Sequence, residues 1–593
     1  MPHLLAVLAV AALGAVALAL PEDPTITHAR GSLTGKRLQS AGLREGVQSR
    51  DYAAFWGIPF AEPPVGKLRF KPPKPRDLPE SQFDATNEHN PACIQQHRTS
   101  LRVTGEEDCL NLQVFTPSYD VANLPVVVLI HGGGFMFSQG PRSGVQYIMD
   151  YDVVLVVIAY RLNVLGFMSF EDPELQGNLG MLDQVEALKW VQRNVHHFGG
   201  DKDSVTLVGN SAGCASCLLH TMSPMSKGLF HRVIGTSGTP LNPWAQQHSA
   251  RENADRVASL VGCNASTTAD KVACLQTKPA AEIVGLQAEN FQPWMLNPFA
   301  PFSTVVDGLF LTGEPEKVLE DKNAVMDVPL MLGFVPLEGL FPGGEFFFND
   351  SLVRELDEHW DTTAPELLNF HDKRVLEAEK PTLSRKIREF YLKNLSLESG
   401  KEQLMKLMTD RNFLSGVSSH ISRRASVQSQ PVYAFEFAHR GEYSYYGGGL
   451  GVGHGDDMLY PLDLLGPFHR EDDQVVRRNL LDLWFSFIKT SKPSVPGVVW
   501  EPVQPNNAEP SVNYLRIAGP NDMTMTTAKN LGNVAFWKDW KDIQPKGTIS
   551  LTRYTTRGVS RKPPQQFGLQ VRISAQLNDQ LHLLTLPPAQ YAI

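Results

Sequence analysis

The sequence predicts an α/β fold in which a large, mainly parallel sheet carries helices on both faces. Short apolar runs alternate along the chain with segments whose apolar residues recur at helical spacing. The run 153–158, Val-Val-Leu-Val-Val-Ile, has no polar position, as expected for a strand buried on both faces. A serine flanked by glycines lies between a strand pattern and a helix pattern at 205–219. These observations indicate one large α/β domain.

The expected elements follow one another between residues 124 and 517. Apolar residues recur at helical spacing from Met181 to Val195, and the segment 473–490 is predicted to be a second amphipathic helix. We find no linker that separates two domains and no internal repeat. The other strands are expected at 124–130, 205–208, 232–235, 329–333, 432–437 and 514–517.

The segment Gly-Asn-Ser-Ala-Gly at 209–213 follows one of these strands and precedes a helix-compatible run at 214–219. Strand, Gly-x-Ser-x-Gly and helix form the nucleophile elbow of an α/β-hydrolase. The sharp turn crowds the backbone, so that only residues without a Cβ fit beside it. The motif also occurs by chance, and a plain glycine-rich turn is the alternative. On the first interpretation, Ser211 is a nucleophile at the edge of the sheet.

Three successive glycines follow the predicted strand 124–130, in the segment His-Gly-Gly-Gly-Phe at 131–135. Such a run weakens folding through chain entropy and therefore needs a reason. One reason is a flexible turn. The other is an oxyanion hole, where backbone N–H groups approach a substrate oxygen because no side chains intervene, as in the glycine-rich loop of lipases and esterases.

Several short segments together carry a family pattern, namely GIPFAEPP at 57–64, EDCLNL at 107–112, HGGGF at 131–135, YRLN at 160–163, GN at 177–178, DQ at 183–184, FGGD at 198–201, GNSAG at 209–213 and HGD at 454–456. With them the chain resembles the cholinesterase/carboxylesterase (type-B) family of α/β-hydrolases over about residues 27–540. The resemblance implies a Ser-His-Glu triad and no cofactor. It also implies an oxyanion hole formed by the amides of Gly133, Gly134 and Ala212.

A serine hydroxyl is a poor nucleophile unless a neighbouring base takes its proton. His454, in a glycine-dense loop after a strand, is the candidate base. A carboxylate must hold that imidazole in the right tautomer. Glu338 stands at the position of the family's acid. The residues before it differ from the family, because Phe-Val-Pro at 334–336 stands where a turn that contains Asn is usual. Asp307 and Asp457 are the fallback carboxylates.

The predicted activity is hydrolysis of neutral carboxylic esters through an acyl-enzyme on Ser211, with a small-molecule ester as the substrate. Juvenile-hormone-like methyl esters and lipid esters remain alternatives. An alternative of another class is a non-catalytic adhesion or binding protein, which this fold also includes. No His-Glu-x-x-His or comparable spacing predicts a metal site. The sequence leaves the oligomeric state open.

The first loop between cysteines distinguishes this chain from cholinesterases within the resemblance. Cholinesterases carry a Trp in that loop and a Glu before the nucleophile, whereas this loop, 94–108, has no Trp, Tyr or Phe and has two arginines. Asn210 precedes the serine. A quaternary ammonium group is best held over an aromatic face. The sequence therefore predicts that choline esters are not favoured, unless Trp294 or Phe346 turns inward.

Composition and the two ends of the chain agree with a secreted enzyme. The 593 residues are 42% hydrophobic with a net charge of −9, and no basic patch suggests nucleic acid. Residues 1–19 are predicted to be a cleaved signal peptide, with an uncleaved anchor as the alternative. The catalytic domain is expected at 20–545, followed by an irregular tail at 546–593 of unknown role. No later run is long and apolar enough to span a membrane.

Six cysteines and three glycosylation sequons fit an oxidising compartment. The resemblance supports disulfides between Cys93 and Cys109 and between Cys263 and Cys274. Cys214 and Cys217 form a C-x-x-C on the helix after the elbow, where packing is a simpler explanation than redox chemistry. The sequons are predicted to be surface sites, at Asn264, Asn349 and Asn394.

Overall fold

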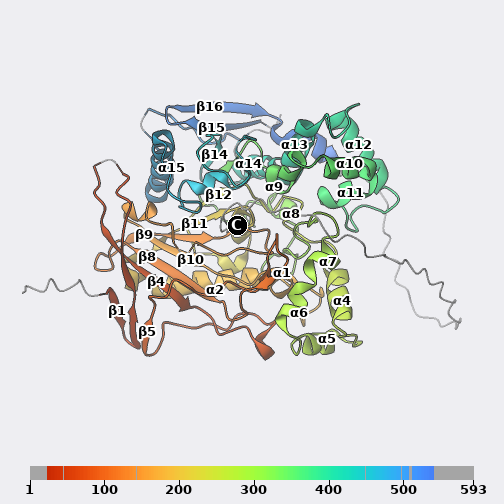
Figure 1. Cartoon of the computed structure of the whole chain (residues 1–593). Coiled ribbons are helices and arrows are strands. Elements are labelled where there is room, and N and C mark those ends of the chain that lie inside the picture. Colours follow the sequence, from red (N-terminus) through yellow and green to blue (C-terminus); the bar gives the residue numbers. More distant parts are fainter. Residues whose placement is uncertain are drawn as a thin grey trace, which may run out of the picture.

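The computed structural model describes residues 23–539, except 45, 142, 448, 496 and 506–510. The predicted leader 1–19 and tail 546–593 lie outside the described residues. An 11-stranded sheet forms the centre of the described part, in the spatial order β16-β15-β14-β13-β12-β11-β9-β10-β8-β4-β3 (Figure 1). The strands are β3 Lys36–Gln39, β4 Asp51–Pro59, β8 Asn111–Thr116, β9 Leu124–Ile130, β10 Val154–Ile158, β11 Gly200–Asn210, β12 Arg232–Thr236, β13 Leu330–Phe334, β14 Val432–Phe437, β15 Ser511–Gly519 and β16 Asp522–Lys529.

The seven central strands, from β10 to β15, pair in parallel with their neighbours. The strands β8, β4 and β3 at one edge and β16 at the other pair antiparallel. The α/β fold class is confirmed, and every strand expected from an apolar run belongs to the parallel centre. Because parallel strands end at the same edge of a sheet, the loops after β9, β11, β13 and β14 meet there.

Alternate residues of the central strands enter two separate hydrophobic cores, one on each face of the sheet. On β9, Val126 and Val128 join the core with α2 (Leu179–Asn194) and α3 (Ala212–His220). Val127 and Leu129 join the core with α15 (Glu471–Thr490). Side chains of successive strand residues point to opposite faces, so a wholly apolar run is what two covered faces require.

The remaining helices gather mainly in two groups, α4–α7 and α10–α13, on the same side of the view in Figure 1. The second group is inserted between β13 and β14 and has a hydrophobic core of its own, which includes Val353, Ile387 and Leu404. No helix within the described ranges is long and apolar enough to cross a membrane. The helices not yet given are α1 Asn163–Phe167, α4 Ala250–Leu260, α5 Thr268–Leu275, α6 Ala280–Gly285, α7 Gln287–Phe291, α8 Pro315–Val318, α9 Leu340–Gly343, α10 Asp350–Glu358, α11 Trp360–Leu367, α12 Lys380–Leu392, α13 Lys401–Thr409, α14 Ser415–Val427 and α16 Val534–Asp539.

Short strands form two further small sheets at the N-terminal end of the described chain. The strands β1 (Thr25–His28), β2 (Gly31–Thr34) and β5 (Gln82–Asp84) make one. The hairpin of β6 (Gln95–Gln96) and β7 (Val103–Thr104) makes the other.

Candidate active site

Ser211 sits between the end of β11 and the first residue of α3, with φ 58° and ψ −125°. These angles lie outside the regions that a non-glycine residue normally adopts, so the backbone is strained there. The turn is tightly enclosed, because a Cβ on Gly213 would lie 2.1 Å from the carbonyl oxygen of Ile130. The Ser211 N–H donates to the carbonyl of Thr236 over 2.8 Å, which ties the turn to the end of β12. The structure thus has the strand–turn–helix geometry that the motif predicts.

The glycine loop after β9 lies directly beside this turn. A Cβ on Gly132 would lie 3.1 Å from the Cβ of Ser211. Gly133 has φ +100°, and a Cβ there would lie 2.0 Å from the carbonyl oxygen of Phe137, so no other residue fits. The amide N–H groups of Gly133, Gly134 and Ala212 donate no hydrogen bond to any other residue that the structure describes. These three donors are available to an external acceptor.

His454 and Glu338 meet over a buried hydrogen bond. The Nδ1–H of His454 donates to Oε2 of Glu338 over 2.6 Å. The other carboxylate oxygen, Oε1, accepts from the N–H of Val335 over 3.0 Å. Glu338 is 0% exposed and His454 only 5%. Both oxygens of the buried carboxylate therefore have partners, and the imidazole has a fixed tautomer and orientation.

Contacts between loops bring this pair to the serine turn. The N–H of Leu337 donates to the carbonyl of Val452 over 3.1 Å, which joins the two loops that carry Glu338 and His454. Gly455 lies beside Asn210, whose Oδ1 would be 3.9 Å from a Cβ there. The ends of β11, β13 and β14 thus bring Ser211, Glu338 and His454 to one place. Asp307 instead accepts from N–H groups of its own loop, at Leu309 and Leu311.

Asp457, the other fallback carboxylate, is a buried acid near Glu338 and His454, and it forms no hydrogen bond with the imidazole in the described structure. It is 2% exposed, and its Oδ1 has no hydrogen-bond partner within the described structure. Burial raises the pKa of Asp457 to about 7, and the negative charge of Glu338 adds to that rise against the side-chain hydrogen bond with Thr236. The fold thus favours the protonated form of this carboxyl group.

Asp457→Asn is expected to gain stability relative to the wild type as the pH rises from 5 to 8. The folded pKa of Asp457 lies above its unfolded value, so the folded wild type holds a proton more tightly and loses stability as pH rises towards 7. Asparagine does not titrate. Between these two pH values the difference in unfolding free energy between the two proteins should change by up to about 3 kcal/mol, measured from denaturation curves at both pH values. An unchanged difference would contradict the buried proton.

Aromatic side chains that the sequence did not point to enclose the imidazole. The rings of Phe341 and Phe413 lie 5.5 and 4.4 Å from that of His454, centre to centre. Phe341 also contacts Phe299 edge-on, and Phe299 covers Gly134 of the glycine loop. In the sequence, only the position of Phe341, three residues after Glu338, could have indicated that an aromatic ring lies near the imidazole. These rings make an apolar wall from the glycine loop to the base.

The cysteines pair as the resemblance implies, with disulfides Cys93–Cys109 and Cys263–Cys274. Cys214 and Cys217 are free and buried. Burial raises the pKa of both thiols, which keeps them protonated and unreactive. Cys214 packs against the backbone of Gly235 on β12. The structure therefore favours packing over redox chemistry for this pair.

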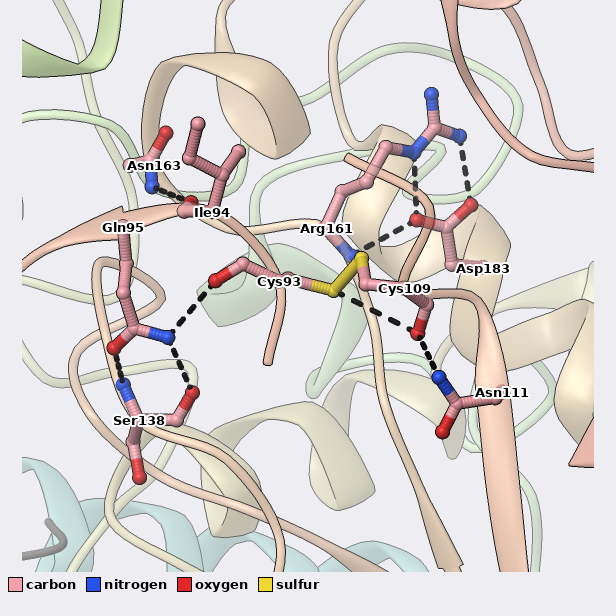
Figure 2. Close-up of a disulfide and its surroundings, with 9 residues drawn as sticks. All are labelled: Cys93, Ile94, Gln95, Cys109, Asn111, Ser138, Arg161, Asn163 and Asp183. Atoms are coloured by element: carbon pink, nitrogen blue, oxygen red, sulfur yellow. Dashed lines mark hydrogen bonds and ion pairs between the residues drawn. A yellow bond between two sulfur atoms is a disulfide. The ribbon is translucent and has the colours of Figure 1, made fainter. Parts of the chain in front are cut away.

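The first disulfide is anchored to the glycine loop by side-chain amides (Figure 2). Gln95 exchanges two hydrogen bonds with the backbone of Ser138, over 2.6 and 3.0 Å. The Asn163 amide donates to the carbonyls of Ile94 and Met136, so it holds both loops at once. A buried ion pair between Arg161 and Asp183 lies beside them. The disulfide loop has a fixed place next to the candidate site.

Three kinds of comparison with known proteins all find similarity to carboxylic ester hydrolases. The model of the carboxylesterase family matches residues 22–537. A carboxylic ester hydrolase of Bombus ignitus is 36% identical over 508 residues, covering 82% of this chain and 90% of that protein. A juvenile hormone esterase of Tribolium castaneum is 32% identical, covering 87% and 91%. The crystal structure of juvenile hormone esterase from Manduca sexta, with OTFP covalently attached, superposes with a TM-score of 0.74 at 27% identity, covering 88% of this chain and 100% of that one.

Proposed function

The chain belongs to the carboxylesterase family and is a carboxylic ester hydrolase, and from this premise we propose that Ser211 is its nucleophile, His454 its general base and Glu338 the acid that orients the base. The observation that supports the proposal is the buried hydrogen bond between His454 and Glu338, brought beside the strained turn of Ser211. The free amides of Gly133, Gly134 and Ala212 form the oxyanion hole.

The reaction is then a two-step acyl transfer. Ser211 attacks the ester carbonyl while His454 takes its proton, and the alcohol leaves with that proton. The three amides stabilise the negative charge on the carbonyl oxygen, an interaction worth about 2.7–4 kcal/mol for one such donor. Water, activated by His454, then attacks the acyl-enzyme and releases the acid. Glu338 stabilises the imidazolium that forms in both steps.

Labelling with a fluorophosphonate probe tests the nucleophile. The wild-type protein should take up one probe on the peptide that contains Ser211, found by mass spectrometry after digestion. Ser211→Ala should remain unlabelled, whereas Ser216→Ala on the same helix should label like the wild type. Labelling of another serine would overturn the assignment of Ser211, but the chain would still belong to the carboxylesterase family.

We propose that the substrates are neutral esters rather than choline esters. The loop that holds an aromatic residue in cholinesterases has none here, and its arginines repel a cation. Trp294 and Phe346 stack on each other at 6.1 Å, and the indole N–H of Trp294 donates to Glu355 on α10. Their contacts thus lie with the inserted helices, which supports the proposal that they do not replace the missing aromatic residue of the disulfide loop.

Butyrylthiocholine is therefore expected to have no advantage in kcat/KM over an uncharged thioester of similar size. A desolvated cation–π site is worth about 2 kcal/mol, or about 30-fold, and its absence should remove that preference. Initial rates with both thioesters on the same enzyme preparation give the ratio directly. A choline preference of tenfold or more would contradict the assignment.

Methyl esters of lipid-like acids are a second candidate class, because two similar proteins are named juvenile hormone esterase. The apolar wall of Phe299, Phe341 and Phe413 suits a long apolar substrate. A panel of esters graded in acyl and alcohol size would distinguish them from short neutral esters. A steep preference for methyl esters with long acyl chains would favour the second class.

We also propose that the mature enzyme starts at residue 20 and is secreted and glycosylated. The supporting observations are the apolar leader, the two disulfides, and a relative named venom carboxylesterase-6 of Apis mellifera. All sequon asparagines, Asn264, Asn349 and Asn394, are exposed. The tail 546–593 is proposed to lie outside the catalytic domain, since the family match ends at 537.

A further inference from the structure

Arg98 holds a positive charge close to the proposed base. It lies in the turn between β6 and β7, within the loop closed by the Cys93–Cys109 disulfide. Its guanidinium carbon is 4.5 Å from the ring centre of Phe341, and that ring is 5.5 Å from the imidazole centre of His454. Taken end to end, these distances of 4.5 and 5.5 Å place the guanidinium within 10 Å of the imidazole centre.

The charge on Arg98 has no partner of opposite sign at contact distance. Its guanidinium forms no ion pair or hydrogen bond with any residue in the described part of the chain, and Glu345 acts on it only at longer range. By contrast, the guanidinium of Arg69, near the same disulfide, donates one hydrogen bond to each carboxylate oxygen of Glu107. Desolvation lowers the pKa of Arg98, but an arginine stays protonated at neutral pH. The side chain is half-buried on the ring of Phe341, and its N–H donors, which have no acceptor among the described residues, can bind one that a ligand supplies.

The position of this charge is fixed by the fold. The side-chain amide of Gln96 donates to the carbonyl of Leu101 over 3.0 Å, and the N–H of His97 donates to the carbonyl of Arg102 over 2.7 Å. These bonds close the turn that carries Arg98. The base of the same loop is attached through Gln95 to Ser138, three residues after the glycine loop (Figure 2). These bonds hold the turn in place, and the contact with Phe341 places the guanidinium.

We propose that Arg98 binds a carboxylate carried by the ester substrate away from its scissile carbonyl. This inference rests on the proposed function and extends its substrates from neutral esters to anionic ones, namely half-esters of dicarboxylic acids and esters of hydroxy acids. The planar guanidinium matches a carboxylate with two parallel hydrogen bonds. An arginine stays protonated and cannot accept a proton, so the charge sets specificity and takes no part in the proton transfer. Arg98 is a specificity-determining residue.

Matched substrate pairs test the inference. In the first pair the acyl chain ends in a carboxylate or a carboxamide, as in mono-p-nitrophenyl adipate and its terminal amide. In the second pair the same two groups end the alcohol chain. We measure kcat/KM for each substrate with the full-length wild type, with Arg98→Gln, and with Arg102→Gln, which removes an exposed arginine from the same turn.

The ratio of carboxylate to carboxamide should fall about 10- to 100-fold in Arg98→Gln for one pair, while both carboxamides keep their wild-type kcat/KM within about twofold. The ratio should be unchanged in Arg102→Gln. Unchanged ratios in Arg98→Gln for both pairs would overturn the inference. An equal loss of kcat/KM for carboxylate and carboxamide would also overturn it, and would indicate that Arg98 only supports the ring of Phe341. If the wild type hydrolyses none of the four substrates, the proposed function fails instead.

Discussion

Replacing Ser211 with alanine is expected to lower kcat by about 10⁴- to 10⁶-fold. The variant keeps the oxyanion amides and the apolar wall but has no nucleophile to form the acyl-enzyme. His454→Ala should lose a comparable factor, because an unassisted hydroxyl is a poor nucleophile. The double variant should be little worse than either one, since residues that act as a unit are strongly non-additive. Steady-state kinetics on purified variants gives all the factors.

Ser216→Ala is the matched control for the serine variant. Ser216 lies buried on α3, the same helix that follows Ser211. Its hydroxyl contacts Met181 and Gln184 instead of the site. Its kcat should stay within a few-fold of the wild type. A loss in Ser216→Ala as large as that in Ser211→Ala would mean that repacking of the helix, and not loss of the nucleophile, stops the reaction.

Glu338→Gln is expected to lower kcat by about 10³- to 10⁴-fold while the protein stays folded. The amide oxygen still accepts from Val335, but a neutral amide neither fixes the right imidazole tautomer nor stabilises the imidazolium. Far-UV circular dichroism and thermal denaturation check the fold. Asp307→Asn is the matched control and should keep its activity, because that carboxylate only caps its own loop. Wild-type turnover in Glu338→Gln, with loss in Asp457→Asn, would move the role to Asp457.

The parallel centre of the sheet could be predicted from the sequence because both of its faces are covered. Strands such as 154–158 have only apolar residues, a pattern that burial on both sides requires. The outer strands gave a weaker signal. On β16 most side chains are exposed or half-buried, so nothing in the apolar pattern distinguishes it from a polar loop. The same holds for β3. The helices α10–α13 pack their apolar faces against one another in a core of their own, so their place relative to the sheet could not be predicted from those faces.

The strained turn at Ser211 and the glycine loop beside it could be predicted from the sequence because their motifs constrain the backbone. A turn that excludes every Cβ at Gly213 leaves a mark in the sequence. The contacts of Arg98 and Asp457 leave no such mark, since an arginine or an aspartate is compatible with almost any exposed position. Their environments arise from chain segments far apart in the sequence, such as Arg98 against Phe341 and Asp457 against Thr236. Only the folded structure shows which charges are left without partners.

The helices α10–α13 lie between Glu338 and His454 in the sequence, and they form a hydrophobic core of their own. The two residues on either side of this insertion are joined by the sheet and by their own hydrogen bond. The end of the insertion also supports them, because Thr409 on α13 accepts from the N–H of Gly339 and Phe413 contacts the ring of His454. An engineer who replaces the helices α10–α12 would therefore have to keep the end of α13 for the geometry of Glu338 and His454 to be inherited intact.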